Sequence, residues 1–294
     1  MRRAISTVPP AQAVHPALAR NPDGAPDYVL RAAWSGLHEA LSAEWTKLRT
    51  LPGTFWLLAA VVATTVAVST AAAAAVSCPH GGCSVDPAKV SLTGIYLGQA
   101  VAAILGVLVI SSEYSTGMIR ATITAMPGRT TVLAAKAAII GGLALAAGAI
   151  AVAGSLLAGR ALLTGHGFTP AHGYPALTLG DGPVLRAAAG SVLYLALIAL
   201  LSLGVATIIR DPAPAIGTVL GLLYLDPIIA AVLHGAHWHN VIERYAPMTA
   251  GLAIQATTGL SSLPISPWAG LGVLAAWAAG ALLLGGLLLR LRDA

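Results

Sequence analysis

Both cysteines of the chain fall in one short polar segment, Cys78-Pro-His-Gly-Gly-Cys83. Proline and the paired glycines favour a turn that can bring the two sulfur atoms together. Because such a pair is stable in an oxidising compartment, a Cys78–Cys83 disulfide is the first expectation for this segment. A metal site that uses His80 as a third ligand and a pair of free thiols are the alternatives.

Three histidines, His234, His237 and His239, are close enough in the sequence to share a zinc ion. Only Glu243 lies near them as a further ligand, so a solvated polar loop is the favoured interpretation. We therefore predict no metal site for this chain.

Asp226 is the only acidic residue that falls inside one of the long apolar segments. An unpaired carboxylate in hydrocarbon is costly unless it pairs with another group or meets water, so such residues mark functional sites by default. This makes Asp226 a candidate for the translocation path of a transporter. The following Pro227 supports the alternative that the segment ends early or re-enters and leaves Asp226 near the outer membrane interface.

Motifs for nucleotide binding and hydrolysis are missing from the sequence. The only lysines are Lys47, Lys89 and Lys136, and none of them stands in a G-x-x-x-x-G-K-[ST] arrangement. The G-x-S-x-G and H-E-x-x-H patterns are missing as well. We expect no catalytic residues and no cofactor on this chain.

The composition is that of a membrane protein. Of 294 residues, 57% are hydrophobic and 9% are charged, and the mean hydropathy is +0.81; in soluble domains about a quarter of the residues are charged. No basic run is longer than Arg2-Arg3, so nucleic acid is not an expected partner. We predict an all-α polytopic membrane protein whose six transmembrane helices cover residues 54–76, 93–112, 137–158, 187–209, 214–233 and 268–289.

Three regions follow from this pattern: a disordered cytoplasmic tail at 1–29, an amphipathic helix at 30–52 and the six-helix domain at 53–294. With the N-terminus placed in the cytoplasm, only Lys89, Arg160, Arg186 and Arg244 of the 16 lysines and arginines fall in outer loops. The positive-inside rule therefore predicts a cell-membrane protein with both termini in the cytoplasm. The glycines of the third and sixth spans are expected to face neighbouring helices.

The helix before the first span has one apolar stripe, formed by Trp34, Leu37, Leu41, Trp45 and Leu48. Steps of three and four residues keep this stripe on one side of the helix. Two tryptophans on an apolar face suit a helix that lies in the membrane interface. A helix packed in the ordinary way against the rest of the protein is the alternative.

A second short helix is expected in the loop after the second span, from Glu113 to Arg129. Ser112 can cap its start, and Pro127-Gly128 can end it. One face carries Met118, Ile119, Thr122, Ile123 and Met126, with Arg120 elsewhere on the helix. Methionine and isoleucine side chains on a cytoplasmic surface suit docking to a soluble partner, and contact with lipid alone is the alternative.

Several of these segments resemble the ABC transporter permeases of the second, export-type class. The resemblance lies in Glu44-Trp-Thr-Lys-Leu-Arg-Thr50 with Phe55-Trp56 after it, in the stretch from Ile110 to Thr124, and more weakly in Asp226-Pro227 and Arg244-Tyr245-Ala-Pro247. It covers about residues 36–290, and the stretch that contains Glu113 is its most specific part.

The resemblance implies a half-transporter that pairs with a second permease copy, identical or different, and with separate ATP-binding cassette subunits that hold ATP and Mg. It implies a connecting helix at about 34–50, which includes Glu44, and a coupling helix at about 114–126. Glu113 would then lie where motion of the ATPase is transmitted. Such relatives export drugs, peptides, lipids or polysaccharides. An ion-coupled secondary transporter and a membrane anchor or immunity subunit without transport remain the other hypotheses.

Overall fold

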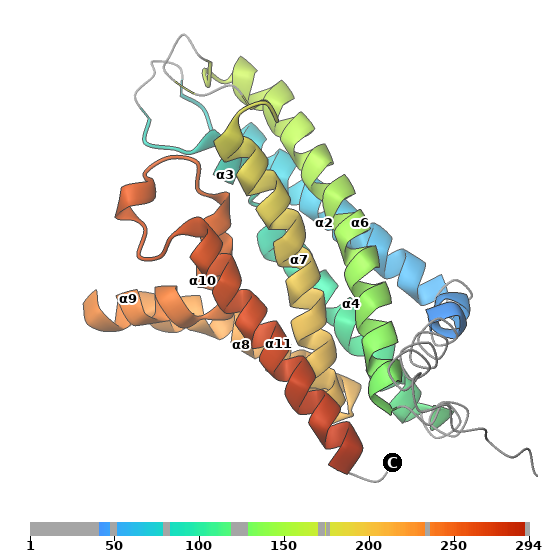
Figure 1. Ribbon diagram of the computed structural model, residues 1–294. Coiled ribbons are helices and arrows are strands. Elements are labelled where there is room, and N and C mark those ends of the chain that lie inside the picture. The colour runs from blue at the N-terminus through green and yellow to red at the C-terminus, as the bar shows by residue number, and fades with distance from the viewer. Residues whose placement is uncertain are drawn as a thin grey trace, which may run out of the picture.

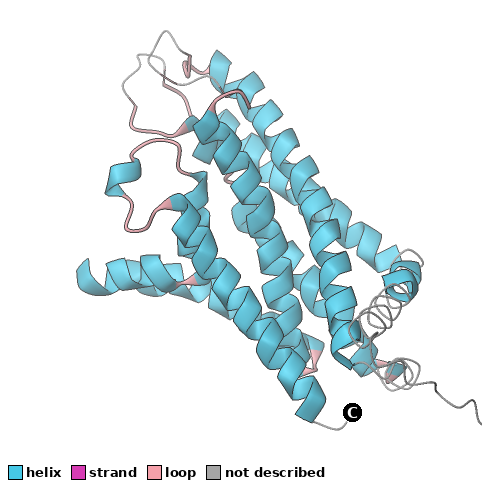
Figure 2. Cartoon of the chain, viewed as in Figure 1, coloured by secondary structure: helices cyan, strands magenta, loops and turns pink. Residues whose placement is uncertain are grey.

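The computed structural model describes residues 41–47, 52–78, 83–118, 129–169, 174, 177–232 and 236–291. Helices dominate these residues, and no strand occurs among them (Figure 2). The helices long and apolar enough to cross a membrane are α2 (Pro52–Ala75), α4 (Ile95–Ser115), α6 (Arg129–Gly165), α7 (Gly182–Ile209), α8 (Pro212–Val232) and α11 (Pro267–Leu291). Within these described residues, the prediction of an all-α fold with six helices of spanning length and composition is confirmed.

The central helices of the bundle are α4 and α7, which are the most buried of the six. Around them lie α2, α6 and α11, while α8 is the least buried (Figure 1). The core includes Leu105 and Ile110 of α4 and Leu195, Ile198 and Leu201 of α7, all almost fully buried.

Helix α6 is much longer than the span predicted at 137–158. It has 37 residues, about 55 Å at 1.5 Å per residue, whereas the hydrocarbon core of a bilayer is about 30 Å thick. Hydropathy stops the predicted span at Lys136 because a charged side chain is penalised there. The helix continues through Lys136 to Arg129, since its alanine-rich sequence contains no helix-breaking proline.

Helix α4 extends beyond the predicted end of the second span. Ser112 does not cap a new helix, which corrects that prediction: its hydroxyl donates to the Leu108 carbonyl (2.6 Å) inside α4. The helix ends at Ser115, and Gly117 follows with a positive φ of 71°, a conformation that suits glycine. Residues 114 and 115 of the expected coupling helix therefore belong to α4, while residues 119–128 lie outside the described part of the chain.

Helix α8 does not end at Asp226-Pro227. It continues to Val232 with Pro227 inside it, so the interpretation that this segment breaks off at Asp226 is wrong. After α8 the chain forms α9 (Ala236–Tyr245), which projects sideways from the bundle in Figure 1. Helix α10 (Pro247–Leu252) and the single turn η2 (Ala253–Gln255) then return to the bundle, and η3 (Leu260–Ser262) leads to α11.

Two loops meet at the end of the bundle that carries α3 (Pro87–Ser91), near the top of Figure 1. Asp86 caps α3 by accepting a hydrogen bond from the Ala88 N–H (3.0 Å). Its other carboxylate oxygen accepts from the N–H groups of Thr257 (2.6 Å) and Thr258 (3.1 Å). One carboxylate thus joins the loop before α4 to the loop before α11.

Close helix packing depends on glycines that the sequence analysis did not single out. A Cβ atom at Gly106 of α4 would lie 2.3 Å from the Ala199 carbonyl oxygen of α7. The prediction that the glycines of α6 and α11 face neighbouring helices holds only in part. Gly154 and Gly285 do approach a neighbouring helix, but nothing lies within 4 Å of a Cβ at Gly142 or Gly280; Gly141, Gly148 and Gly286 make ordinary contacts.

We expect Gly106→Val to lower the stability of the folded protein by at least about 1–3 kcal/mol, because the new side chain meets backbone rather than a movable side chain. Gly142→Val is the matched control, since that position is open. The measurement is the thermal unfolding midpoint of each purified variant in detergent. Equal midpoints for the two variants would contradict the close contact between α4 and α7.

Candidate functional site

Four charged side chains of alternating sign meet where the helix at 41–47, the end of α4 and the start of α6 come together. The Lys136 ammonium donates to Glu44 Oε2 (2.6 Å) and to Glu113 Oε1 (2.7 Å). The Lys47 ammonium donates to Glu44 Oε1 and Glu113 Oε1, both at 3.1 Å. We call Glu44, Lys47, Glu113 and Lys136 the charge cluster.

The charge cluster is largely shielded from solvent. Glu44 and Glu113 are 4% exposed and Lys136 is 1% exposed, whereas the Lys47 side chain is 34% exposed and forms the outer rim. Two carboxylates and two ammonium groups leave no net charge. A buried ionic group is tolerated only when its charge is compensated and its hydrogen bonds are made, and here each ammonium contacts both carboxylates.

One carboxylate oxygen is an exception. Oε2 of Glu113 is buried and accepts no hydrogen bond from any group in the described part of the chain. Its partner oxygen Oε1 accepts from both lysines. A buried acceptor without a donor is uncommon in folded proteins.

The lysine at the rim stays charged across the neutral range. Burial lowers the pKa of Lys47, but the carboxylates of Glu113 and Glu44 act in the opposite direction and leave this pKa above its ordinary value of 10.5. A raised pKa means that the folded state holds the proton more tightly than the unfolded state does. The resulting stabilisation is present below pH 10.5 and is lost only as the pH rises beyond it.

The helix at 41–47 faces the bundle with its charged residues, not with its tryptophan. Glu44 is buried, while Trp45 is 50% exposed and Leu41 is partly buried. Trp45 is therefore available to lipid, as an interfacial helix requires. Trp34, Leu37 and Leu48 lie outside the described residues.

Only part of the predicted coupling face can be placed. Glu113, which the resemblance puts at the point where ATPase motion is transmitted, is buried between the two lysines and does not face solvent. Met118 is 48% exposed. Ile119, Arg120, Ile123 and Met126 lie outside the described residues.

Sequence reasoning missed the two lysines of the charge cluster. Lys136 lies just before the span predicted at 137–158, and Lys47 was singled out only as part of the segment from Glu44 to Thr50. The available signal was that Lys136 directly precedes a predicted span and that Lys47 lies three residues after the motif residue Glu44. Because residues 44, 113 and 136 are far apart along the chain, no local pattern could show that they meet.

The other candidate residues lie elsewhere. Asp226 is on α8, partly exposed, and is not a member of the charge cluster. His234 lies outside the described residues, as do the side chains of His237 and His239. Within the described residues, no group of three or more histidine, cysteine or acidic side chains could hold a metal ion.

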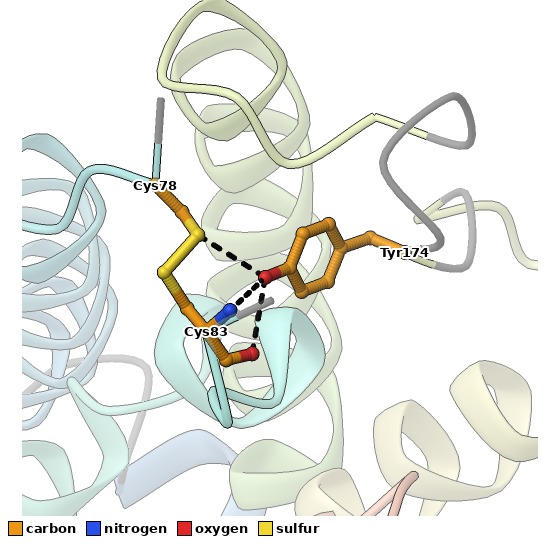
Figure 3. The surroundings of a disulfide bond; sticks show 3 residues. All are labelled: Cys78, Cys83 and Tyr174. Carbon is orange, nitrogen blue, oxygen red and sulfur yellow. Dashed lines mark hydrogen bonds between the residues drawn. A yellow bond between two sulfur atoms is a disulfide. The ribbon is translucent and has the colours of Figure 1, made fainter. Parts of the chain in front are cut away.

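Cys78 and Cys83 are joined by a disulfide, with their Cα atoms 6.2 Å apart. Figure 3 shows Tyr174 pointing its hydroxyl at this bridge. The Tyr174 oxygen accepts from the Cys83 N–H (2.8 Å), and its proton is shared between the Cys83 carbonyl (3.0 Å) and Cys78 Sγ (3.2 Å). The Tyr174 ring packs against Phe168 with their centroids 4.9 Å apart, so the bridge is part of a small second core.

Replacing Lys136 by methionine should destabilise the folded protein by about 3–5 kcal/mol, because it leaves two buried carboxylates with one shared ammonium. Adding Glu113→Gln should recover part of the loss by removing one of these charges. Lys89→Met, at an exposed lysine, is the control and should change stability by less than about 0.5 kcal/mol. Unfolding titrations in mixed micelles measure all three, and a Lys136→Met variant as stable as the control would contradict the charge cluster.

Tyr174→Phe should leave the disulfide formed but make it faster to reduce, since the hydroxyl that contacts both cysteines is removed. The readout is the rate at which maleimide labelling appears after a phosphine reductant is added. Tyr245→Phe is a matched control on an exposed tyrosine. Labelling of the wild-type protein before any reductant is added would show free thiols and refute the bridge itself.

Compared with models of protein families and with curated protein sequences, the chain matches none. The resemblance to export-type permeases therefore depends on the motifs quoted above. The six apolar helices and the charge cluster are the features on which a functional proposal can build.

Proposed function

We propose that this chain is the membrane-spanning permease subunit of an ATP-binding-cassette exporter, with ATP and Mg held by a separate ATPase subunit. The observation that carries the proposal is the position of the charge cluster. It joins both ends of the segment expected to dock on the ATPase: Glu113 precedes that segment and Lys136 follows it. It also holds Glu44 of the connecting helix.

This arrangement suits the transmission of force. A push on the loop between α4 and α6 acts on two helices that are joined directly by the Lys136–Glu113 contact (2.7 Å). They are also joined through the helix at 41–47, by Lys136–Glu44 (2.6 Å) and Lys47–Glu113 (3.1 Å). In this proposal the ionic contacts make the two helix ends move together. In this proposal Glu113 is a positioning residue, and the apolar side chains of the loop make the contact with the ATPase.

The surface of α8 supports pairing with a second permease copy. Its exposed side includes the large apolar residues Leu225, Ile228 and Val232, which are 53%, 58% and 66% exposed. Nothing lies within 4 Å of a Cβ at Gly217 or Gly221, and small residues four apart allow two membrane helices to approach closely. Whether the second copy is identical or different is left open in the proposal.

Asp226 lies on this same helix, between Leu225 and the exposed Ile228. A carboxylate beside a surface that meets a second copy would line the space between the two copies, which suits a translocation path. The cargo class proposed is that of the permeases this chain resembles: a drug, peptide, lipid or polysaccharide. The proposal places the chain in the cell membrane with both termini in the cytoplasm.

The test is co-purification. Affinity-tagged wild-type chain from its native membranes should bring down an ATP-hydrolysing subunit, whereas the chain alone should bind no ATP. Ile119→Ala/Ile123→Ala should weaken that association about tenfold or more, because buried apolar contact is lost at the docking face.

Leu157→Ala is the control, since Leu157 is 68% exposed on the membrane part of α6. It should leave the yield of the ATPase unchanged. Recovery of the ATPase at wild-type yield with the double variant would refute the coupling assignment. Tight binding of ATP by the purified chain would refute the need for a separate ATPase.

A further inference from the structure

A groove of about 540 Å³ runs between α6 and α7, which lie side by side (Figure 1). Every residue that lines it lies in the stretches 149–160 and 177–192, which the structure describes throughout. The floor of the groove is apolar and buried, and it is formed by Val152, Leu156, Val184 and Ala188. The rim is exposed and includes Leu157, Leu179 and Leu185. The groove therefore opens sideways, at the surface of the bundle.

The length of this groove matches one leaflet of a bilayer. Along α6 it extends from Ala149 to Arg160, which is about 16 Å at 1.5 Å per residue. This is about half of a hydrocarbon core of ~30 Å. Below Ala149 the two helices close on each other, because a Cβ atom at Gly148 would lie only 3.6 Å from the Val192 Cα. An acyl chain that enters from one side of the membrane fits these limits.

Arg160 lies at the depth of the phosphate headgroups. It follows Lys136 by 24 positions on α6, about 36 Å along the helix, and no residue between them is charged. Because the hydrocarbon core is about 30 Å thick, the two charged residues fall on opposite sides of it. Leu163, one turn beyond Arg160, packs in the second core with Cys78. Arg160 thus belongs to the leaflet at the disulfide end of the bundle.

The Arg160 guanidinium is exposed and lines the groove. Among the described residues, no carboxylate forms an ion pair with it. Residues 170–173 and 175–176 of the following loop contain no aspartate or glutamate, so they cannot supply a carboxylate. Asp181, the next acidic residue of the chain, instead accepts a hydrogen bond from the Thr178 hydroxyl (3.2 Å). An accessible arginine without a carboxylate is complementary to a phosphate.

We propose that this groove binds one phospholipid, with its phosphate at Arg160 and an acyl chain between α6 and α7. The arginine recognises the phosphate, which phospholipids share and glycolipids lack, and the apolar floor fixes the chain beneath it. The fit of charge at the mouth and length below it indicates a lipid in place of a free anion. This site does not depend on the transport function proposed above.

The experiment uses the purified full chain in detergent and two lipids with the same acyl chains, phosphatidylcholine and monogalactosyl diacylglycerol. Neither lipid has a net charge, so a general attraction to a basic protein does not separate them. Retention is measured by native mass spectrometry in direct competition. We expect phosphatidylcholine to be favoured by about fivefold, as suits a charge-assisted contact at an exposed arginine.

Two pairs of variants assign the preference to this groove. Arg160→Gln removes the charge and should abolish the preference, whereas Lys89→Gln, at another exposed cation of the same end, should keep it. Ala153→Trp fills the groove without changing a charge and should also abolish the preference. Ala146→Trp is its control, at an exposed alanine of α6 outside the groove. Arg160→Gln alters an exposed side chain and remains a full test if Ala153→Trp does not fold.

Equal retention of the two lipids by the wild-type chain would overturn the proposal, since the phosphate would then not be recognised. A preference kept in Arg160→Gln or in folded Ala153→Trp would place the lipid at another surface and refute this groove. Displacement of phosphatidylcholine by soluble glycerol phosphate would overturn it too, because the acyl chain would then contribute nothing. A dimer of the wild-type chain that is lost in Ala153→Trp would show that a second copy, and not a lipid, fills the groove. None of these results bears on whether the chain associates with an ATPase.

Discussion

The burial of Lys136 is the constraint on which this structure depends. An ammonium group near the start of a long apolar helix cannot be taken out of water without carboxylates beside it. Glu113 of α4 and Glu44 of the preceding helix supply them, at 2.7 and 2.6 Å. This requirement ties α4 to α6 and holds the helix at 41–47 beside them. The charge cluster is therefore required for the burial of Lys136, and it is also the point at which three segments of the chain are joined.

Elsewhere in the described part of the bundle, the helices are held together by close packing and not by ion pairs. Between α4 and α7 the contact is close because Gly106 lets the two backbones approach, and between α7 and α11 Gly204 does the same against Ala281. Inside a membrane, packing of this kind replaces the hydrophobic effect as the source of helix association. The loops at the disulfide end are joined by hydrogen bonds, chiefly those of Asp86 and Tyr174.

The sequence was enough to predict the coarse fold, because apolar stretches of spanning length are a strong signal. It failed at helix ends, for identifiable reasons. The third span appeared short because Lys136 counts against a hydrophobic segment unless its partners are known. Ser112 looked like a cap, but its hydroxyl bonds backward within α4 instead. In the same way, proline at 227 suggested a break, yet a helix with few neighbours can accommodate it at the cost of one hydrogen bond.

For the candidate site too, features within one short segment could be predicted, whereas contacts between distant segments could not. Glu44 and Glu113 could be singled out from motifs, and the cysteine pair from its spacing. The lysine at 136, the pairing of residues 44, 113 and 136, and the role of Tyr174 beside the disulfide all depend on contacts between segments far apart in sequence. No periodicity or spacing rule reports such contacts, so only the folded chain reveals them.

Helix α6 has a mechanical consequence that follows from its length alone. From Lys136 to Gly165 it runs for about 44 Å and contains no proline. At its far end the His166 carbonyl accepts the Cys78 N–H (2.8 Å), and Gly159 lies close enough to Ser91 that a Cβ there would be 2.0 Å from the hydroxyl oxygen. A tilt of about 5° at the charged end would displace the far end by about 4 Å, far more than such contacts tolerate. The charge cluster thus holds the start of α6 and the disulfide segment contacts its far end, so a rigid tilt of this helix would disturb both ends of the bundle.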